Sequence, residues 1–267
     1  MQLDRQIELS GLQLDKTHIQ RQFDRSASRY DDVAQMQLQI TKDLMAYAPV
    51  KACSGLQILD AGCGTGYGMQ ALSGAYPKAS IVGLDMAPAM LEIAKVQCPN
   101  AQCQVGDIEQ LQFQSNCFDL TWSSSAVQWC DIEQAAKELL RVTKPGGQVL
   151  VSTFSNGTLQ DWRALWSLAN TDDRFESDKS IVNAFQQAGL IDIKFETRTY
   201  AQSFTSFKQA VNSIRDLGAG NAEQSRSRGL FGVEQYKDIK AKVNKLIDLN
   251  GELNLPYFVT FVAGTKG

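Results

Sequence analysis

The stretch that decides the fold is LDAGCGTGYG, residues 59–68, which follows directly on a short apolar run. Its glycines, Gly62, Gly64 and Gly66, permit a sharp turn and leave bare backbone where a side chain would collide with a bound molecule. In open α/β sheets, ligands bind outside the carboxyl ends of the strands. The stretch therefore predicts a binding loop at the end of the first strand of a parallel sheet.

The loop departs from the dinucleotide-binding pattern. GxGxxG beginning at Gly62 requires glycine at position 67, where Tyr67 stands. Asp60 precedes the glycines, and a carboxylate is unfavourable beside a pyrophosphate at a helix N-terminus. Asp60 suits a ligand that carries a cationic amine or sulfonium, so a nicotinamide-dependent reductase is disfavoured. A purely structural turn is the alternative that the loop alone leaves open.

Short apolar runs alternate with helical patterns on the C-terminal side of this loop. Such alternation, with strands apolar on both faces, predicts an α/β fold whose parallel sheet is covered by helices on each side. On the N-terminal side, Val33, Met36, Ile40, Leu44 and Tyr47 share one face of a helix that is expected to end before Pro49. The predicted strands are 56–60, 80–85, 103–107, 118–124, 148–154, 192–202 and 257–264, and the predicted helices are 66–76, 88–98, 132–143, 161–170, 179–190, 205–217 and 233–249.

Acidic residues follow two further predicted strands. Asp85 ends the second strand, where doubly wound nucleotide binders place a carboxylate on ribose hydroxyls. Asp107 ends the third strand, within reach of the same crevice. As alternatives, Asp85 caps the helix that begins at Pro88, and Asp107 caps a turn. Together with Asp60, they place acids at three consecutive strand ends beside a glycine loop, which favours a shared binding site.

Composition excludes several kinds of site. The 267 residues carry 26 Lys+Arg and 29 Asp+Glu, a net charge of −3, and 43% are hydrophobic, as in ordinary globular proteins. The N-terminus lacks the apolar stretch of a signal peptide, and a cytoplasmic protein is expected. His18 is the only histidine, so a Ser-His-Asp triad would depend on it, and no metal site is expected. The six cysteines form no CxxC pair and are expected to be small buried thiols.

These residues resemble the class I S-adenosylmethionine (SAM)-dependent methyltransferases. The matching elements are DAGCGTG at 60–66, Asp85, the pair Gly106–Asp107, FDLTWSSSAVQW at 118–129 and KPGG at 144–147. The resemblance implies a Rossmann-like, mostly parallel seven-stranded sheet with an antiparallel last strand, and SAM as co-substrate. It also implies a cofactor site in which Gly62, Gly64 and Gly66 face the methionine portion near Asp60, Asp85 holds the ribose, Met86 packs on adenine, Asp107 and Ile108 read the adenine edge, and Ser124 meets the cofactor.

A narrower resemblance extends from Phe23 to Phe261. The segments FDRSASRYDDVAQMQ (23–37), SSAVQWC (124–130) and SIRDLGAGN (213–221) are similar to the malonyl-[acyl-carrier-protein] O-methyltransferases of biotin synthesis. Resemblance to that family implies methylation of the free carboxyl of a malonyl thioester, giving the methyl ester that starts pimeloyl synthesis. The chain departs from the family at Arg215, where lysine is usual, and in the residues after Asn221.

The implied chemistry fits the residues present. A malonyl carboxylate is already ionised at pH 7, so no general base is required. The enzyme must orient this carboxylate, exclude water and offset its charge. We expect Arg215 to pair with the carboxylate, Tyr30 to close the methionine end of the site and Trp129 to form a wall of the substrate pocket. The alternatives are a solvated arginine on a helix face and two aromatic residues that only pack.

The segment 201–250 differs from the rest in charge, with eight basic and five acidic residues. An acidic carrier protein is the expected partner, docking through Arg226, Arg228, Lys237 and Lys240, unless these residues only form a solvated face. Nucleic acid and membrane are not expected partners. We expect one domain, 1–267, made of an N-terminal helical lid (1–50), a SAM-binding core (51–155), the rest of the core (156–204), a helical insertion that serves as substrate lid (205–250) and the last strand (251–267).

Two other functions stay open at this point. One is a methyltransferase that acts on another small acid or a quinone-type precursor, because one fold can host many acceptors. The other is a non-catalytic SAM-binding protein.

Overall fold

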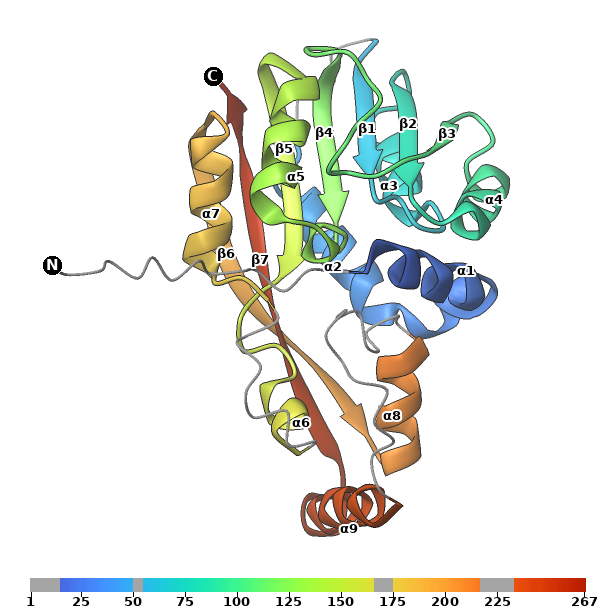
Figure 1. Ribbon diagram of the computed structural model, residues 1–267. Helices are drawn as coiled ribbons and strands as arrows, with labels where there is room; N and C mark the ends of the chain where they lie inside the picture. Colours follow the sequence, from blue (N-terminus) through green and yellow to red (C-terminus); the bar gives the residue numbers. More distant parts are fainter. Residues whose placement is uncertain (1–14, 50–54, 166–174, 217–232) are drawn as a thin grey trace, which may run out of the picture.

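The computed structural model describes residues 15–49, 55–165, 175–216 and 233–267. Their centre is a seven-stranded sheet with the strand order β3-β2-β1-β4-β5-β7-β6 (Figure 1). Strands β1 to β5 run parallel, and β7 is antiparallel to both of its neighbours. This confirms the expected Rossmann-like α/β fold. The strands are β1 (Gln57–Ala61), β2 (Ser80–Asp85), β3 (Gln102–Val105), β4 (Phe118–Ser124), β5 (Thr143–Phe154), β6 (Leu190–Phe204) and β7 (Leu253–Lys266).

Helices cover both faces of the sheet, as the apolar strands predicted. One buried cluster joins α2 and α3 to one face, and a second joins α5 and α7 to the other (Figure 1). The core helices are α3 (Tyr67–Ala75), α4 (Pro88–Gln97), α5 (Ile132–Val142), α6 (Gln160–Leu165) and α7 (Asp178–Gln187), with a 3₁₀ turn, η1, at Val127–Trp129. No helix within the described ranges combines the length and the apolar character that crossing a membrane requires.

The N-terminal segment forms two helices, α1 (Lys16–Val33) and α2 (Gln35–Met45), where the sequence pattern predicted one. The break is at Ala34, which is fully buried and has ψ of 27°, outside the helical range. The prediction was therefore wrong for Val33, which belongs to α1, whereas Met36, Ile40 and Leu44 lie buried on α2. The break allows α1 to leave the direction of α2 and lie below the arrowheads of β1 and β2 (Figure 1).

Strands β6 and β7 form a long antiparallel pair that extends beyond the rest of the sheet. They pair from Leu190 opposite Lys266 to Phe204 opposite Leu253, whereas β5 pairs with β7 only as far as Val259. The remaining helices, α8 (Phe207–Asp216) and α9 (Val233–Asn250), lie at the far end of this pair (Figure 1). The insertion before the last strand is therefore carried on an extension of the sheet, and α8 packs against α1.

Candidate functional site

A cavity of about 910 Å³, counted to its opening, lies at the carboxyl ends of the parallel strands. This volume includes the open space at the mouth of the cavity. The strand ends and loops form its floor, and α1 and α2 contribute Phe23, Tyr30, Gln37, Leu38 and Thr41. The predicted site residues that line it are Tyr30, Asp60, Gly62, Gly64, Asp85, Met86, Asp107, Ile108, Ser124 and Trp129.

Two glycines of the loop serve different purposes. Gly62 has φ of +79°, and a Cβ there would lie 2.2 Å from the Cβ of Ala126, so the loop can approach the end of β4 only with glycine at this position. Gly66, with φ of +97°, begins α3 and would meet Ala94 at 3.2 Å. It does not line the cavity. Gly66 thus shapes the turn into α3, whereas Gly62 and Gly64 face the cavity.

Asp85 is held by backbone donors from two segments. Its Oδ2 accepts a hydrogen bond from the N–H of Gly64, and its Oδ1 accepts one from the N–H of Ala87, both at 2.9 Å. Burial raises the pKa of Asp85, and these N–H groups oppose that rise. The carboxylate therefore both organises the start of α4 and lines the cavity.

Asp60 lies at the floor of the cavity and is only 2% exposed. Burial, and next the charge of Asp85, raise the pKa of Asp60 to about 8. Its Oδ2 has no hydrogen-bond partner among the described residues, and neither does Nε1 of Trp122, which lies opposite Asp60 on β4. A buried acceptor without a donor is costly, and a cationic ligand would satisfy it.

Asp107 lies two residues beyond the end of β3, which stops at Val105 and not at 107 as predicted. Its Oδ1 accepts hydrogen bonds from the N–H of Glu109 at 3.0 Å and from the ammonium of Lys16 at 3.1 Å. Lys16 also pairs with Glu109 at 2.7 Å and lies 3.7 Å from Sγ of Cys130. The three acidic or thiol groups lie within 4.8 Å of one another, and the lysine ammonium stands among them.

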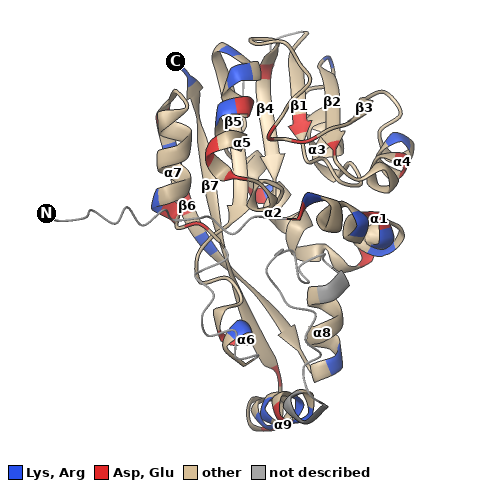
Figure 2. Cartoon of the chain, in the orientation of Figure 1, with Lys and Arg blue, Asp and Glu red and all other residues tan. Residues whose placement is uncertain are grey.

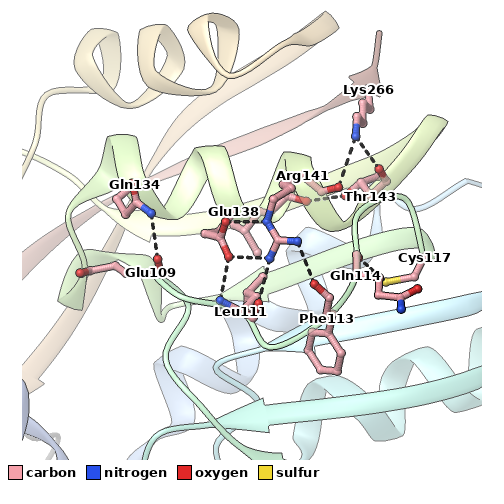
Figure 3. A network of polar contacts seen from close by, with 11 residues as sticks. Glu109, Leu111, Phe113, Gln114, Cys117, Gln134, Glu138, Arg141, Thr143 and Lys266 are labelled. Atoms are coloured by element: carbon pink, nitrogen blue, oxygen red, sulfur yellow. Dashed lines mark hydrogen bonds and ion pairs between the residues drawn. The ribbon is translucent and has the colours of Figure 1, made fainter.

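The loop that carries Asp107 and Ile108 is fixed to α5. Arg141 donates hydrogen bonds of 2.8 Å to the carbonyls of Leu111 and Phe113 and forms a two-point ion pair with Glu138 (Figure 3). Glu138 in turn accepts the N–H of Leu111 at 2.8 Å. This network holds the loop against the sheet, so the residues proposed to contact adenine start from a fixed backbone.

Helix α1 closes the cavity with aromatic side chains and polar contacts. Phe23 packs edge-on against Trp129 at 5.6 Å and against Tyr30 at 6.3 Å between ring centroids. Burial, and next the charges of Asp85 and Asp31, raise the pKa of Tyr30, so its phenol stays protonated. Asp31 accepts hydrogen bonds from Thr65 at 2.6 Å and Gln97 at 2.8 Å. Tyr30 thus lines the cavity from α1.

Sequence reasoning missed several residues that line the cavity, namely Phe23, Gln37, Thr41 and Ser125. Phe23 and Gln37 are the two ends of the segment 23–37 whose resemblance had been noted. Thr41 lies one helical turn after Gln37, and its hydroxyl contacts that of Ser124 at 3.0 Å. The helical period of the N-terminal segment is the signal that could have identified Gln37 and Thr41 together.

The remaining predicted residues lie away from the cavity or outside the described residues. Arg215 is in the last turn of α8, and its side chain lies outside the described residues, as do Arg226 and Arg228. Lys237 and Lys240 lie on α9, which carries several basic residues (Figure 2). His18 is on α1, where its ring contacts Gln22, and it does not line the cavity.

The described cysteines are all free thiols, and Cys53 lies outside the described residues. Cys63 and Cys98 are buried, as expected, whereas Cys103, Cys117 and Cys130 are partly exposed. Burial raises the pKa of Cys130 to about 12, so this cavity residue is a neutral thiol at physiological pH.

Comparisons with known proteins agree with this geometry. Residues 59–151 match the family model described as a methyltransferase domain. A malonyl-[acyl-carrier protein] O-methyltransferase of Herminiimonas arsenicoxydans is 32% identical over 95% of this chain and 97% of its own length. The protein of the same name from Erwinia billingiae is 36% identical over 85% of this chain and 89% of its own. A putative methyltransferase of Bacillus halodurans shares the fold, with a TM-score of 0.61 and 16% identity over 85% of this chain and 99% of that one.

Proposed function

Because the chain belongs to the class I SAM-dependent methyltransferases, we propose that it transfers the methyl group of SAM to the free carboxylate of a malonyl thioester on an acyl carrier protein. The observation that carries this proposal is the similarity to relatives of that name along nearly their whole length, 97% for one and 89% for another.

The cavity residues fit SAM. SAM supplies an electrophilic methyl group on a cationic sulfonium, and its methionine portion adds an ammonium group. Asp60, whose buried Oδ2 has no partner among the described residues, would accept the ammonium. Asp85 would hold the ribose, Met86 would pack on the adenine, and Asp107 with Ile108 would contact the adenine edge. At Gly64, a Cβ would meet no described atom within 4 Å, so there is open space beside the backbone of the loop for SAM.

The site need not supply a general base. The malonyl carboxylate is ionised at neutral pH, so the residues must orient it and keep water away from it. Phe23, Tyr30 and Trp129 form an aromatic cover suited to excluding water. Orientation and avoided solvent reorganisation together account for about 7–11 kcal/mol in well-aligned reactions. A positive charge near the carboxylate would offset its desolvation, and we assign that role to Arg215 on α8.

The carrier protein would approach from the extension of the sheet. Lys237 and Lys240 lie on α9, and Arg226 and Arg228 precede this helix in the sequence. Complementary charge would speed the encounter with an acidic carrier protein more than it would raise affinity.

The test is mass spectrometry of malonyl-carrier protein after incubation with the enzyme and SAM. We expect the acyl group to gain the mass of one methylene, and acetyl-carrier protein, which lacks the free carboxylate, to gain nothing. Tight SAM binding without product from any malonyl thioester would instead favour a non-catalytic SAM-binding protein.

A further inference from the structure

The strand order divides the cavity into a cofactor part and an acceptor part. Asp85 and Asp107 follow β2 and β3, and the glycine loop follows β1, so the proposed adenosine and methionine contacts occupy that side of the sheet. The end of β4 lies on the other side of β1. Ser125, the residue after β4, and Gln37 and Thr41 from α2 line the wall that remains for the methyl acceptor. This inference rests on the proposed function.

Ser125 combines a strained backbone with a hydroxyl that has no partner. Its φ is +54°, in the left-handed region that non-glycine residues rarely occupy. The backbone is fully paired, because its N–H donates to the carbonyl of Ser152 at 2.9 Å and its own carbonyl accepts the Gln128 amide at 2.5 Å. Its Oγ is buried without a hydrogen-bond partner among the described residues. Strained residues of this kind persist mainly at functional sites.

The neighbouring hydroxyls cannot serve as free donors. Thr41 donates its hydroxyl proton to the carbonyl of Gln37 at 2.9 Å, so Ser124 donates to Thr41 across their 3.0 Å contact. Ser152 then donates to Ser124 at 3.1 Å. This chain of hydrogen bonds consumes the protons of all three hydroxyls. Ser125 is therefore the hydroxyl on this wall that keeps a proton to donate.

The second polar group of this wall is the side chain of Gln37 on α2. Its Oε1 is buried and has no hydrogen-bond partner among the described residues. Thr41, one turn along α2, ties this helix to Ser124 at the end of β4, and Gln37 and Ser125 both line the cavity. A carboxamide offers either its oxygen or its NH₂ group after rotation of the terminal bond, so the same side chain can donate to an anion.

We propose that the Ser125 hydroxyl and the Gln37 carboxamide form an acceptor subsite that binds and orients the carboxylate to be methylated. Hydrogen bonds from neutral groups fix the direction of the carboxylate and leave most of the negative charge on its oxygens. The subsite therefore orients the carboxylate, and Arg215 offsets its charge.

Four variants test this assignment by separating effects on the methyl acceptor from effects on SAM binding. Ser125→Gly relieves the positive φ while it removes the hydroxyl, and Ser125→Ala removes the hydroxyl alone. Gln37→Met removes the carboxamide, and Gln37→Glu replaces it with a carboxylate that repels the acceptor. The controls are Gln39→Met and Gln39→Glu on the exposed side of α2. The measurements are kcat and KM for a malonyl thioester, and SAM affinity by calorimetry.

We expect Ser125→Ala, Ser125→Gly and Gln37→Met each to lower kcat/KM for the malonyl thioester by about 10- to 100-fold, as for lost hydrogen bonds to a charged group. SAM affinity should stay within about twofold, because the subsite lies outside the cofactor part. Gln37→Glu should lose more activity than Gln37→Met, without weaker SAM binding, since SAM is a cation. Ser125→Gly should be at least as stable to urea as the wild type, because glycine tolerates the positive φ. A loss of activity in this variant would then come from the missing hydroxyl and not from lower stability.

The other possible results overturn either the acceptor subsite or the proposed function. An active wild type with variants at wild-type kcat/KM overturns the subsite and leaves the proposed function in place. Equal losses of SAM affinity and activity would make Ser125 and Gln37 cofactor or structural residues, which also overturns it. A folded wild type that binds SAM and forms no methyl ester overturns the proposed function, and the subsite with it.

Discussion

The N–H of Gly64 donates a 2.9 Å hydrogen bond to Oδ2 of Asp85, which joins the loop after β1 to the end of β2. The other oxygen of Asp85 accepts the N–H of Ala87 at the same distance. Asp85 therefore shapes the glycine loop as well as lining the cavity. A substitution at Asp85 acts on both, and its effect on SAM must be separated from its effect on the loop.

Asp85→Ala should weaken SAM binding by about 1.5–3 kcal/mol, the usual contribution of hydrogen bonds to a charged group. Asp85→Asn keeps the shape of the side chain, and should weaken binding less. Calorimetry on folded variants measures both, and Glu92→Ala on the exposed side of α4 is the control. Unchanged SAM affinity in a folded Asp85→Ala protein would remove Asp85 from the site.

The contribution of Asp60 to the stability of the SAM-free protein should fall as pH rises from about 4 to about 8. In this window the folded state keeps a proton on Asp60, whose pKa is about 8, whereas the unfolded state has released it, since the ordinary value is 3.8. Asp60→Asn should flatten this dependence and stabilise the SAM-free protein at pH 8 by about 1–3 kcal/mol. Urea unfolding at several pH values measures the difference.

The same substitution should weaken SAM binding, because the amide cannot pair with the ammonium as a carboxylate does. The stability gain and the affinity loss are thus expected together. Identical pH profiles of stability for wild type and Asp60→Asn would show that Asp60 is ionised in the SAM-free protein.

Lys16→Met should speed SAM dissociation about two- to fivefold, because the lysine holds the start of α1 to Asp107 and Glu109 through a partly exposed ion pair. Stopped-flow displacement of SAM measures this rate. Lys137→Met removes an exposed pair with Glu133 on α5 and serves as the control. Slower dissociation from Lys16→Met than from wild type would contradict a closing role for this contact.

His18 and Cys130 should not take part in the chemistry. His18 does not line the cavity, and the pKa of Cys130 lies at about 12. His18→Gln and Cys130→Ala should each keep the methyl-transfer rate within a few fold of wild type. A loss of about a hundredfold or more in either folded variant would reveal a base or nucleophile outside the present account.

Arg215→Ala should lower kcat/KM for the malonyl thioester by the equivalent of about 2–5 kcal/mol, as for a buried charge left without its partner. SAM affinity should hardly change, because α8 lies outside the cavity floor. Arg215→Lys should restore part of the activity, since the charge persists without the bidentate fork. Equal activity of wild type and Arg215→Ala would mean that another group offsets the carboxylate charge.

The sequence predicts the parallel core well because its signals are local. Strands β2 and β4 have the predicted bounds, and the glycine loop and Asp85 lie at one cavity as expected. Alternation of apolar runs depends only on neighbouring residues, and strand ends in a parallel sheet meet at one edge. The resemblance to known methyltransferases then predicted the antiparallel last strand.

Features set by tertiary packing were not predicted. The break at Ala34 occurs in a continuous helical pattern, and the helices on either side of it pack in different apolar clusters. The positive φ of Ser125 and the unpartnered Oε1 of Gln37 have no local sequence signal. The contact between α2 and β4 joins segments that lie far apart in the sequence. Likewise, the length of the β6–β7 pair beyond β5 has no local signal.

Methyl transfer to the malonyl carboxylate is tested most directly by intact-protein mass spectrometry of malonyl-carrier protein incubated with the enzyme and SAM that carries a deuterated methyl group. We expect the acyl group to gain one fully deuterated methyl in place of a proton, and acetyl-carrier protein to gain none. Bound SAM with no labelled malonyl thioester, or equal labelling of the acetyl carrier, would contradict it.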